Sequence, residues 1–128
     1  MSHTHVCVWI DHYEAKVYGI AADSSDASAI SDRQPHHHIH RSADHLGIGT
    51  EPIHPEFLGE VAAALQSAKA ILICGPGNAR RALSRYLEER HPEIAKRVWE
   101  VMPMDHPTEG QIVATARKFF RAADRMHA

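Results

Sequence analysis

Two hydrophobic patterns divide the chain into an earlier and a later part. The earlier part has short apolar runs separated by polar residues, which predicts strands at Val6–Ile10, Ala15–Ile20 and Ala29–Gln34. Polar residues at positions 11–14 separate the first two runs, so these two strands are expected to form a hairpin. Ala22–Ser28 is small and polar and predicts a turn.

The later part alternates between helical and strand patterns. Apolar residues recur at helical spacing in three segments, and Pro92–Lys96 fits one further helical turn. Ala70–Cys74 is a continuous apolar run, typical of a strand buried on both faces, and Val98–Met102 predicts another strand. The three longer helices are expected at Pro55–Ser67, Ala79–Arg90 and Thr108–Met126.

The order of these elements predicts the fold class. An antiparallel meander followed by a parallel β-α-β portion gives one mixed five-stranded sheet with helices on both faces, an α/β fold of three layers. The chain contains no internal repeat and no linker segment. Residues 1–128 are therefore expected to form a single domain.

Composition and charge narrow the classes of function. Hydrophobic residues make up 44% of the chain and charged residues 23%, and the formal net charge is −2. No general polyanion-binding surface follows from that charge, so nucleic-acid contact needs a local patch and no DNA specificity is expected. No apolar run approaches the about 18 residues that span a bilayer, and Met1–His5 begins no signal peptide. We therefore expect a cytoplasmic protein without a membrane partner.

The two cysteines, Cys7 and Cys74, both fall inside apolar runs. There is no CxxC motif, and free cysteine in an apolar run usually behaves as a small buried hydrophobe. We expect both thiols to be reduced and buried in neighbouring strands.

Histidine is the residue type in strong excess, with twelve in the chain. Five of them lie in Pro35–His45, inside a segment, Pro35–Pro52, that has no helical or strand period and is expected to be a long loop. His36, His38 and His40 are spaced so that their imidazoles share one face of an extended chain. Three imidazoles on one face suit a divalent metal such as zinc or nickel, with an open position for catalysis.

The alternative is a solvated loop whose histidines bind metal only opportunistically. The affinity of this loop for a metal and its affinity for an RNA phosphate should depend on pH in opposite directions. Metal affinity should fall as pH drops towards about 6, because protonated imidazole cannot ligate, whereas phosphate affinity should rise. Replacing His36, His38 and His40 together by Ala should abolish either kind of binding.

Two Asp-His pairs end predicted strands. Asp11-His12 follows the first strand and Asp105-His106 follows the last. The carboxyl ends of parallel strands share one sheet edge, where open α/β sheets bind ligands. A carboxylate can orient a histidine and raise its basicity, so Asp11, His12 and His106 are candidate catalytic residues. The alternative is that each Asp caps a local turn through backbone hydrogen bonds.

Two further motifs have simpler explanations. Residues 75–78, Gly-Pro-Gly-Asn, lack a phosphate-loop pattern and predict a tight turn with Asn78 as a helix N-cap. Arg80, Arg81, Arg85 and Arg90 make the following helix basic, which is either a nucleic-acid patch or a solvated face diluted by Glu88 and Glu89. Thr108 and Gln111 have the spacing of a capping box at the start of the last helix.

The chain resembles the central domain of the archaeal and eukaryotic class-1 release factors and of Pelota. The segments that carry this resemblance are Val8–Asp11 with Ala15–Ile20, Ala70–Gly77, and Val101 through the last helix. Pro35–Arg41 and Asp105–Gln111 are also similar to a small bacterial family labelled translational machinery protein.

This resemblance implies a ribonuclease-H-like, release-factor central domain in which the first strand is central and lies beside Ile71–Cys74. It also implies a translation-associated role with RNA or the ribosome as partner. Release factors carry Gly-Gly-Gln after the third strand, and the histidine run stands there instead, so a conventional release factor is not expected. Two alternatives stay open, a metal-dependent hydrolase or nuclease and a metal-binding protein without catalysis, and whether the chain is an enzyme is left open.

Overall fold

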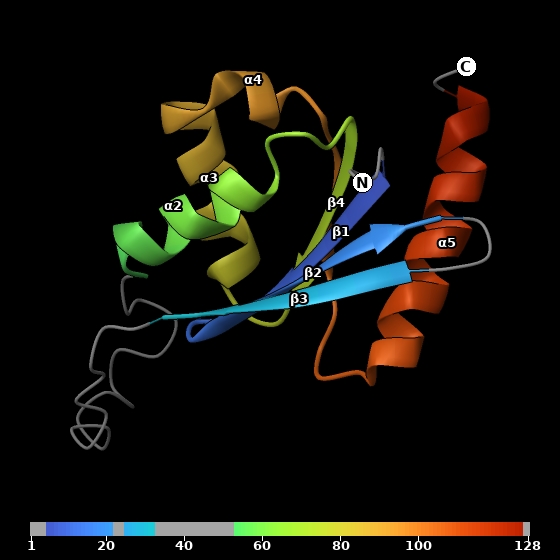
Figure 1. The fold of residues 1–128 in the computed structure, drawn as a ribbon, viewed down its shortest axis with the longest axis horizontal. Helices are drawn as coiled ribbons and strands as arrows, with labels where there is room; N and C mark the ends of the chain where they lie inside the picture. Colours follow the sequence, from blue (N-terminus) through green and yellow to red (C-terminus); the bar gives the residue numbers. More distant parts are fainter. Residues whose placement is uncertain (1–4, 22–24, 33–52, 127–128) are drawn as a thin grey trace.

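The computed structural model describes residues 5–21, 25–32 and 53–126. Within these residues one five-stranded sheet has the strand order β3-β2-β1-β4-β5. Helices α2, α3 and α4 cover one face of the sheet and α5 covers the other, so three layers form (Figure 1). The elements are β1 (His5–Ile10), β2 (Glu14–Ile20), β3 (Ser25–Ser31), α2 (Pro55–Ala64), β4 (Ala70–Gly75), α3 (Ala79–Arg90), α4 (Pro92–Ala95), β5 (Val98–Pro103) and α5 (Glu109–Met126).

The strand directions confirm the predicted fold class. β1 pairs antiparallel with β2, and β2 pairs antiparallel with β3, which forms the meander. β1 pairs parallel with β4, and β4 pairs parallel with β5, which forms the β-α-β portion. β1 is central and lies beside β4, as the resemblance implied.

The third strand differs most from its prediction. The sequence predicted Ala29–Gln34, whereas β3 begins at Ser25 and ends at Ser31. Ala22–Ser28, predicted as a turn, therefore includes the first half of a strand. β3 is an edge strand with almost every side chain exposed, and it is held by its register with β2, from Ile20 opposite Ser25 to Glu14 opposite Ser31. Backbone pairing positions this strand, so it needs no apolar signal.

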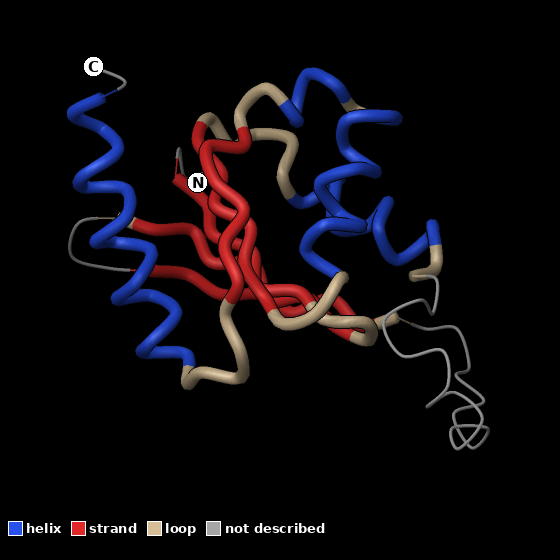
Figure 2. Tube along the Cα trace, turned by 180° about the vertical axis from the view of Figure 1, so that it is seen from behind, coloured by secondary structure: helices blue, strands red, loops and turns tan. Residues whose placement is uncertain are grey.

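Side-chain alternation along the central strands builds two cores. Val8 and Ile10 point towards α2 and α3, and Cys7 and Trp9 point towards α5. β4 is buried over its whole length, which confirms a strand covered on both faces. Figure 2 shows the helices on opposite sides of the strands from behind. None of the helices in the described part of the chain is long and apolar enough to cross a membrane.

Gly75 allows the ends of β1 and β4 to approach closely. Its φ is +147°, and a Cβ placed on it would lie 2.1 Å from the Ile10 carbonyl oxygen. A side chain at this position would collide with backbone, which cannot move without separating the two strands. Glycine is therefore required where β4 ends.

The two cysteines are free and fully buried, in neighbouring strands, as predicted. Their Sγ atoms lie 3.7 Å apart. The hydrogen bond to Cys74 and burial raise the pKa of the Cys7 thiol well above its ordinary value. A protonated, buried thiol is a poor nucleophile, so this pair has a packing role.

Candidate functional site

The carboxyl ends of β1, β4 and β5 meet at one edge of the sheet, as the parallel pairing requires. Met104, just after β5, donates its backbone N–H to the Gly75 carbonyl at 3.1 Å, which ties the last two ends together. The predicted Asp-His pairs and the Gly-Pro-Gly turn all leave the sheet at this edge.

Asp11 is engaged in a local turn. Its Oδ1 accepts backbone hydrogen bonds from Tyr13 and Glu14, both at 2.8 Å. Its own N–H donates to the Glu14 carbonyl at 3.0 Å, which closes the hairpin between β1 and β2. These contacts are the capping role that the sequence offered as the alternative. The ring of His12 lies 6.3 Å from that of Tyr13.

The second Asp-His pair faces solvent. Asp105 Oδ1 lies 3.2 Å from His106 Nδ1, and the two side chains are 94% and 69% exposed. Trp9 donates its indole N–H to the Asp105 carbonyl at 3.0 Å, and its ring lies 5.5 Å from that of His106. Trp9 therefore anchors this loop to β1.

No hydrogen bond or ring contact within the described residues joins His106 to Asp11 or His12. The structure thus brings the predicted catalytic residues to one edge without connecting them. Their catalytic roles stay predictions.

His36, His38 and His40, the predicted zinc or nickel ligands, lie outside the described residues. Among residues 5–21, 25–32 and 53–126, no group of three or more histidine, cysteine or carboxylate side chains is placed to hold a metal ion. The predicted metal site therefore stays a prediction.

An Asp-His pair that the sequence analysis missed lies where β3 ends and α2 begins. Asp32 Oδ2 and His54 Nδ1 are 2.6 Å apart. The Asp32 side chain is 1% exposed and that of His54 is 33% exposed. The carboxylate orients the imidazole, which stands at the N-cap position of α2. The two residues are 22 positions apart and belong to no motif, so only the fold could reveal the pair.

The turn before α3 is held by an arginine. Arg80 donates from Nη1 to the carbonyl oxygens of Gly75 at 3.1 Å and Gly77 at 2.6 Å. Asn78 occupies the N-cap position, as predicted, but makes no side-chain cap hydrogen bond to the helix. The side-chain hydrogen bonds that stabilise the turn therefore come from Arg80, while Asn78 is the N-cap by position only.

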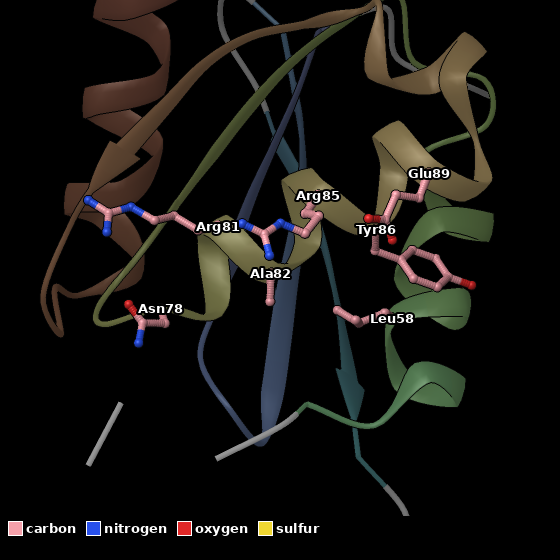
Figure 3. A pocket seen from close by; sticks show the side chains of 7 residues that line it. All are labelled: Leu58, Asn78, Arg81, Ala82, Arg85, Tyr86 and Glu89. Carbon is pink, nitrogen blue, oxygen red and sulfur yellow. The ribbon is translucent and has the colours of Figure 1, made fainter. Parts of the chain in front are cut away.

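A groove lies between α2 and α3 on this side of the sheet. It measures about 410 Å³, a size in the range of small-ligand pockets. Leu58, Ala82 and Tyr86 are its apolar lining, and polar residues complete the rim (Figure 3). The Tyr86 hydroxyl of α3 lies against α2, 3.2 Å from where a Cβ on Gly59 would stand. The lining residues are Leu58, Asn78, Arg81, Ala82, Arg85, Tyr86 and Glu89.

Arg81 and Arg85 give the groove its positive charge. They lie one helical turn apart and are exposed, and Figure 3 shows both guanidinium groups extending out from α3. Neither forms an ion pair or a hydrogen bond with any described residue. Both also border a second hollow of about 480 Å³ between α3 and β5. Glu89 lines the first hollow and Glu88 the second, so each hollow has more arginines than carboxylates in its lining.

Two unpaired guanidinium groups beside an apolar floor can bind a phosphate with the sugar or base attached to it. The local electrostatics therefore favour an anionic ligand on a chain whose net charge is negative. The spacing of the arginines was visible in the sequence, but the groove beside them was not.

Comparison with known proteins shows what this fold is similar to. No family model matches the chain. A Pelota homologue of Archaeoglobus fulgidus is 44% identical over 52 residues, which is 39% of this chain and 15% of that protein. The crystal structure of Archaeoglobus fulgidus Pelota matches 99% of this chain with a TM-score of 0.61 and 20% identity, over 37% of its own length.

An archaeal translation termination factor, aRF1, matches 96% of this chain with a TM-score of 0.56 and 12% identity, over 38% of its own length. The chain thus spans little more than a third of the solved proteins that it matches. These comparisons confirm that its fold is similar to the central domain of Pelota and the release factors.

Proposed function

We propose that this chain is a translation-associated domain that contacts RNA or the ribosome. The likeness of nearly the whole chain to Pelota and to a translation termination factor carries this proposal. A fold hosts many functions, so the contact surface must be argued from side chains. Arg81 and Arg85, beside the groove between α2 and α3, are the residues that we assign to RNA contact.

Peptide release by the usual release-factor chemistry is not part of this proposal. The sequence contains no Gly-Gly-Gln tripeptide. The tripeptide Glu-Gly-Gln at residues 109–111 offers no substitute, because Gln111 caps α5. Its Oε1 accepts from the Thr108 N–H at 2.8 Å, and its own N–H donates to Thr108 Oγ1 at 3.2 Å. The predicted capping box is confirmed.

Single-stranded RNA suits the groove better than a duplex. A phosphate placed between Arg81 and Arg85 would bring its nucleoside towards Tyr86 and Leu58, which form an apolar floor. A duplex keeps its bases stacked inside and would use only the charge. The formal net charge of −2 also means that binding depends on this local surface and should weaken steeply with salt.

Co-sedimentation with purified ribosomes tests the function. We expect the chain to pellet with ribosomes at low salt. The Arg81→Glu/Arg85→Glu variant should bind at least about tenfold more weakly, because two phosphate contacts become repulsive. It should also lower the slope of log affinity against log salt by about 1.4 for a single-stranded RNA oligonucleotide, at about 0.7 for each lost phosphate contact.

Lys69→Glu/Lys96→Glu is the matched control. Both lysines are exposed, and neither lines the groove. This variant changes the net charge by the same amount and should bind almost as the wild type does. Equal losses in the two variants would assign binding to net charge alone. A wild-type chain that stays in the supernatant at low salt would contradict the proposed function.

A further inference from the structure

α5 is basic on the side that faces away from the sheet. Its apolar side chains Ile112, Ala116 and Phe120 are buried against the sheet. Lys118, Arg121 and Arg125 are all exposed. Lys118, Arg121 and Arg125 are spaced three and four residues apart and therefore share one face of the helix. We call these three residues the α5 ridge.

No described residue neutralises the α5 ridge. Lys118, Arg121 and Arg125 have no ion-pair or hydrogen-bond partner among the described residues. The nearby Asp124 accepts from His5 at a distance of 2.9 Å, and Arg117 donates to the Ala21 carbonyl at 3.1 Å. The neighbouring charges are thus engaged in fixing α5 to the sheet, while the ridge charges face solvent.

The shape and chemistry of the ridge fit a phosphate backbone. Seven residues of helix extend about 10 Å, so the three cations form a straight row. The large apolar side chains of this helix point inwards, apart from Met126 at the end, which is 85% exposed. An interfacial membrane helix needs an apolar face free to enter lipid, and here that face is buried in the core. Charge complementarity therefore favours RNA over a lipid surface.

The α5 ridge lies on the opposite side of the sheet from Arg81 and Arg85. α3 and α5 flank the strands on different sides in both views of the whole chain (Figures 1 and 2). The layer of strands separates the two helices, so we expect each basic surface to bind its own short RNA segment.

We propose that the α5 ridge is a second RNA-backbone contact, so that one copy of this domain bridges two RNA segments. The bridging rests on the proposed function at α3, but binding at α5 does not. The ridge presents three cations on the convex surface of a helix, so it should recognise mainly charge and show less preference between RNA sequences than the α3 groove.

Energy transfer between two RNA strands tests the bridging. The probes are two non-complementary single-stranded RNA oligonucleotides, one carrying a donor dye and the other an acceptor. Wild-type protein should produce transfer and bind two oligonucleotides per chain, as counted by analytical ultracentrifugation. The Lys118→Glu/Arg121→Glu/Arg125→Glu variant should lose most of the transfer and bind one oligonucleotide, with an unchanged circular-dichroism spectrum and Tm.

The Arg81→Glu/Arg85→Glu variant separates this inference from the proposed function. We expect it to lose transfer as well and to keep one bound oligonucleotide at the α5 ridge. If the Arg81→Glu/Arg85→Glu variant binds RNA like the wild type while the ridge variant binds none, the assignment of RNA contact to Arg81 and Arg85 is wrong. RNA binding at the α5 ridge then stands. Full transfer in the ridge variant, or a wild type that binds a single oligonucleotide, would overturn the inference. The inference would also be overturned if phosphatidylserine vesicles bound the wild type more tightly than RNA does and did not bind the ridge variant.

Discussion

The two faces of the sheet carry similar charge but offer it in different surroundings. On one face, α2, α3 and α4 cover the larger of the two cores, and Arg81 and Arg85 border a groove with an apolar floor. On the other face α5 alone covers a smaller core, and its cations stand on a convex helix. A groove can select a ligand by shape as well as charge, whereas a ridge can only attract charge. The layered architecture, rather than the number of arginines, therefore separates recognition from simple attraction.

Changing Gly75 should damage both faces, because β4 supports both. Gly75→Ala should cost at least about 3 kcal/mol of unfolding free energy, since its Cβ would lie 2.1 Å from the Ile10 carbonyl oxygen. Gly77→Ala is the matched control. Gly77 has a φ of +61° but open space around it, so it should cost only about 1 kcal/mol. Urea unfolding measures both values, and equal costs would show that β1 and β4 do not approach so closely.

Truncation of one large side chain in each core compares the faces directly. Leu83 is fully buried under α3 and Phe120 is 4% exposed under α5. Leu83→Ala should cost about 2 to 5 kcal/mol and Phe120→Ala about 3 to 5 kcal/mol. Hydrogen exchange should distinguish them. Because α5 alone covers its face, Phe120→Ala should release protection in α5 while α3 stays protected. Uniform loss of protection across the molecule would show that the two faces unfold as one unit.

The cap of α5 should have a smaller effect. Gln111→Ala removes one side of the capping box and should cost about 1 kcal/mol or less, without changing RNA or ribosome binding. Thermal melting and co-sedimentation measure these two properties. A loss of binding at unchanged Tm would mean that Gln111 contacts the partner instead of the helix.

Tyr18, beneath α5, should have the smallest effect near neutral pH. Its hydroxyl is buried and has no hydrogen-bond partner among the described residues, and burial, followed by the charge of Glu109, raises its pKa to about 12. The raised pKa means that the folded chain holds this proton more tightly than the unfolded chain does. The contribution of the Tyr18 proton to the free energy of unfolding should therefore be complete below pH about 10 and be lost as pH rises towards 12.

Tyr18→Phe should be neutral or slightly stabilising at pH 7, by about 1 kcal/mol at most, because it removes a buried hydroxyl without a partner. It should also flatten the loss of stability between pH 10 and 12. Urea unfolding across this pH range, with Tyr13→Phe at an exposed position as the control, checks both effects. A Tyr18→Phe variant with an unchanged alkaline profile would contradict the raised pKa.

Burial of the thiols gives a last check on the sheet. Cys7 and Cys74 belong to neighbouring central strands, so a thiol reagent should label the native chain far more slowly than the unfolded chain. Rapid labelling of native protein would show that α5 opens readily from its face.

The elements with strong apolar periodicity were predictable. The boundaries of α3 were predicted correctly, and β1 and β4 differ from their predictions by one residue at one end. α2 ends at Ala64 instead of Ser67, and Leu65, the last residue of its apolar stripe, is the C-cap and stays fully buried. β3 was misplaced because its small polar residues carry no pattern, and its position comes from pairing with β2.

The candidate site was predictable only in part. The basic character of α3 and the shared edge of the Asp-His pairs followed from spacing and strand direction. The use of the Asp11 carboxylate in a turn, and of Arg80 in holding Gly75 and Gly77, depends on hydrogen-bond geometry that spacing does not define. The metal prediction for His36, His38 and His40 concerns residues outside those that the structure describes.

The sequence by itself determined the local choices, namely the strands that are buried on both faces and the helices with one apolar stripe. Each of these depends on side chains within a few positions of one another, so periodicity records it. The tertiary structure alone decided the partners, which include the groove between α2 and α3, the pairing of Asp32 with His54 across 22 positions, and the opposite placement of two basic surfaces. These features depend on how layers stack, and stacking brings together residues that no local pattern relates.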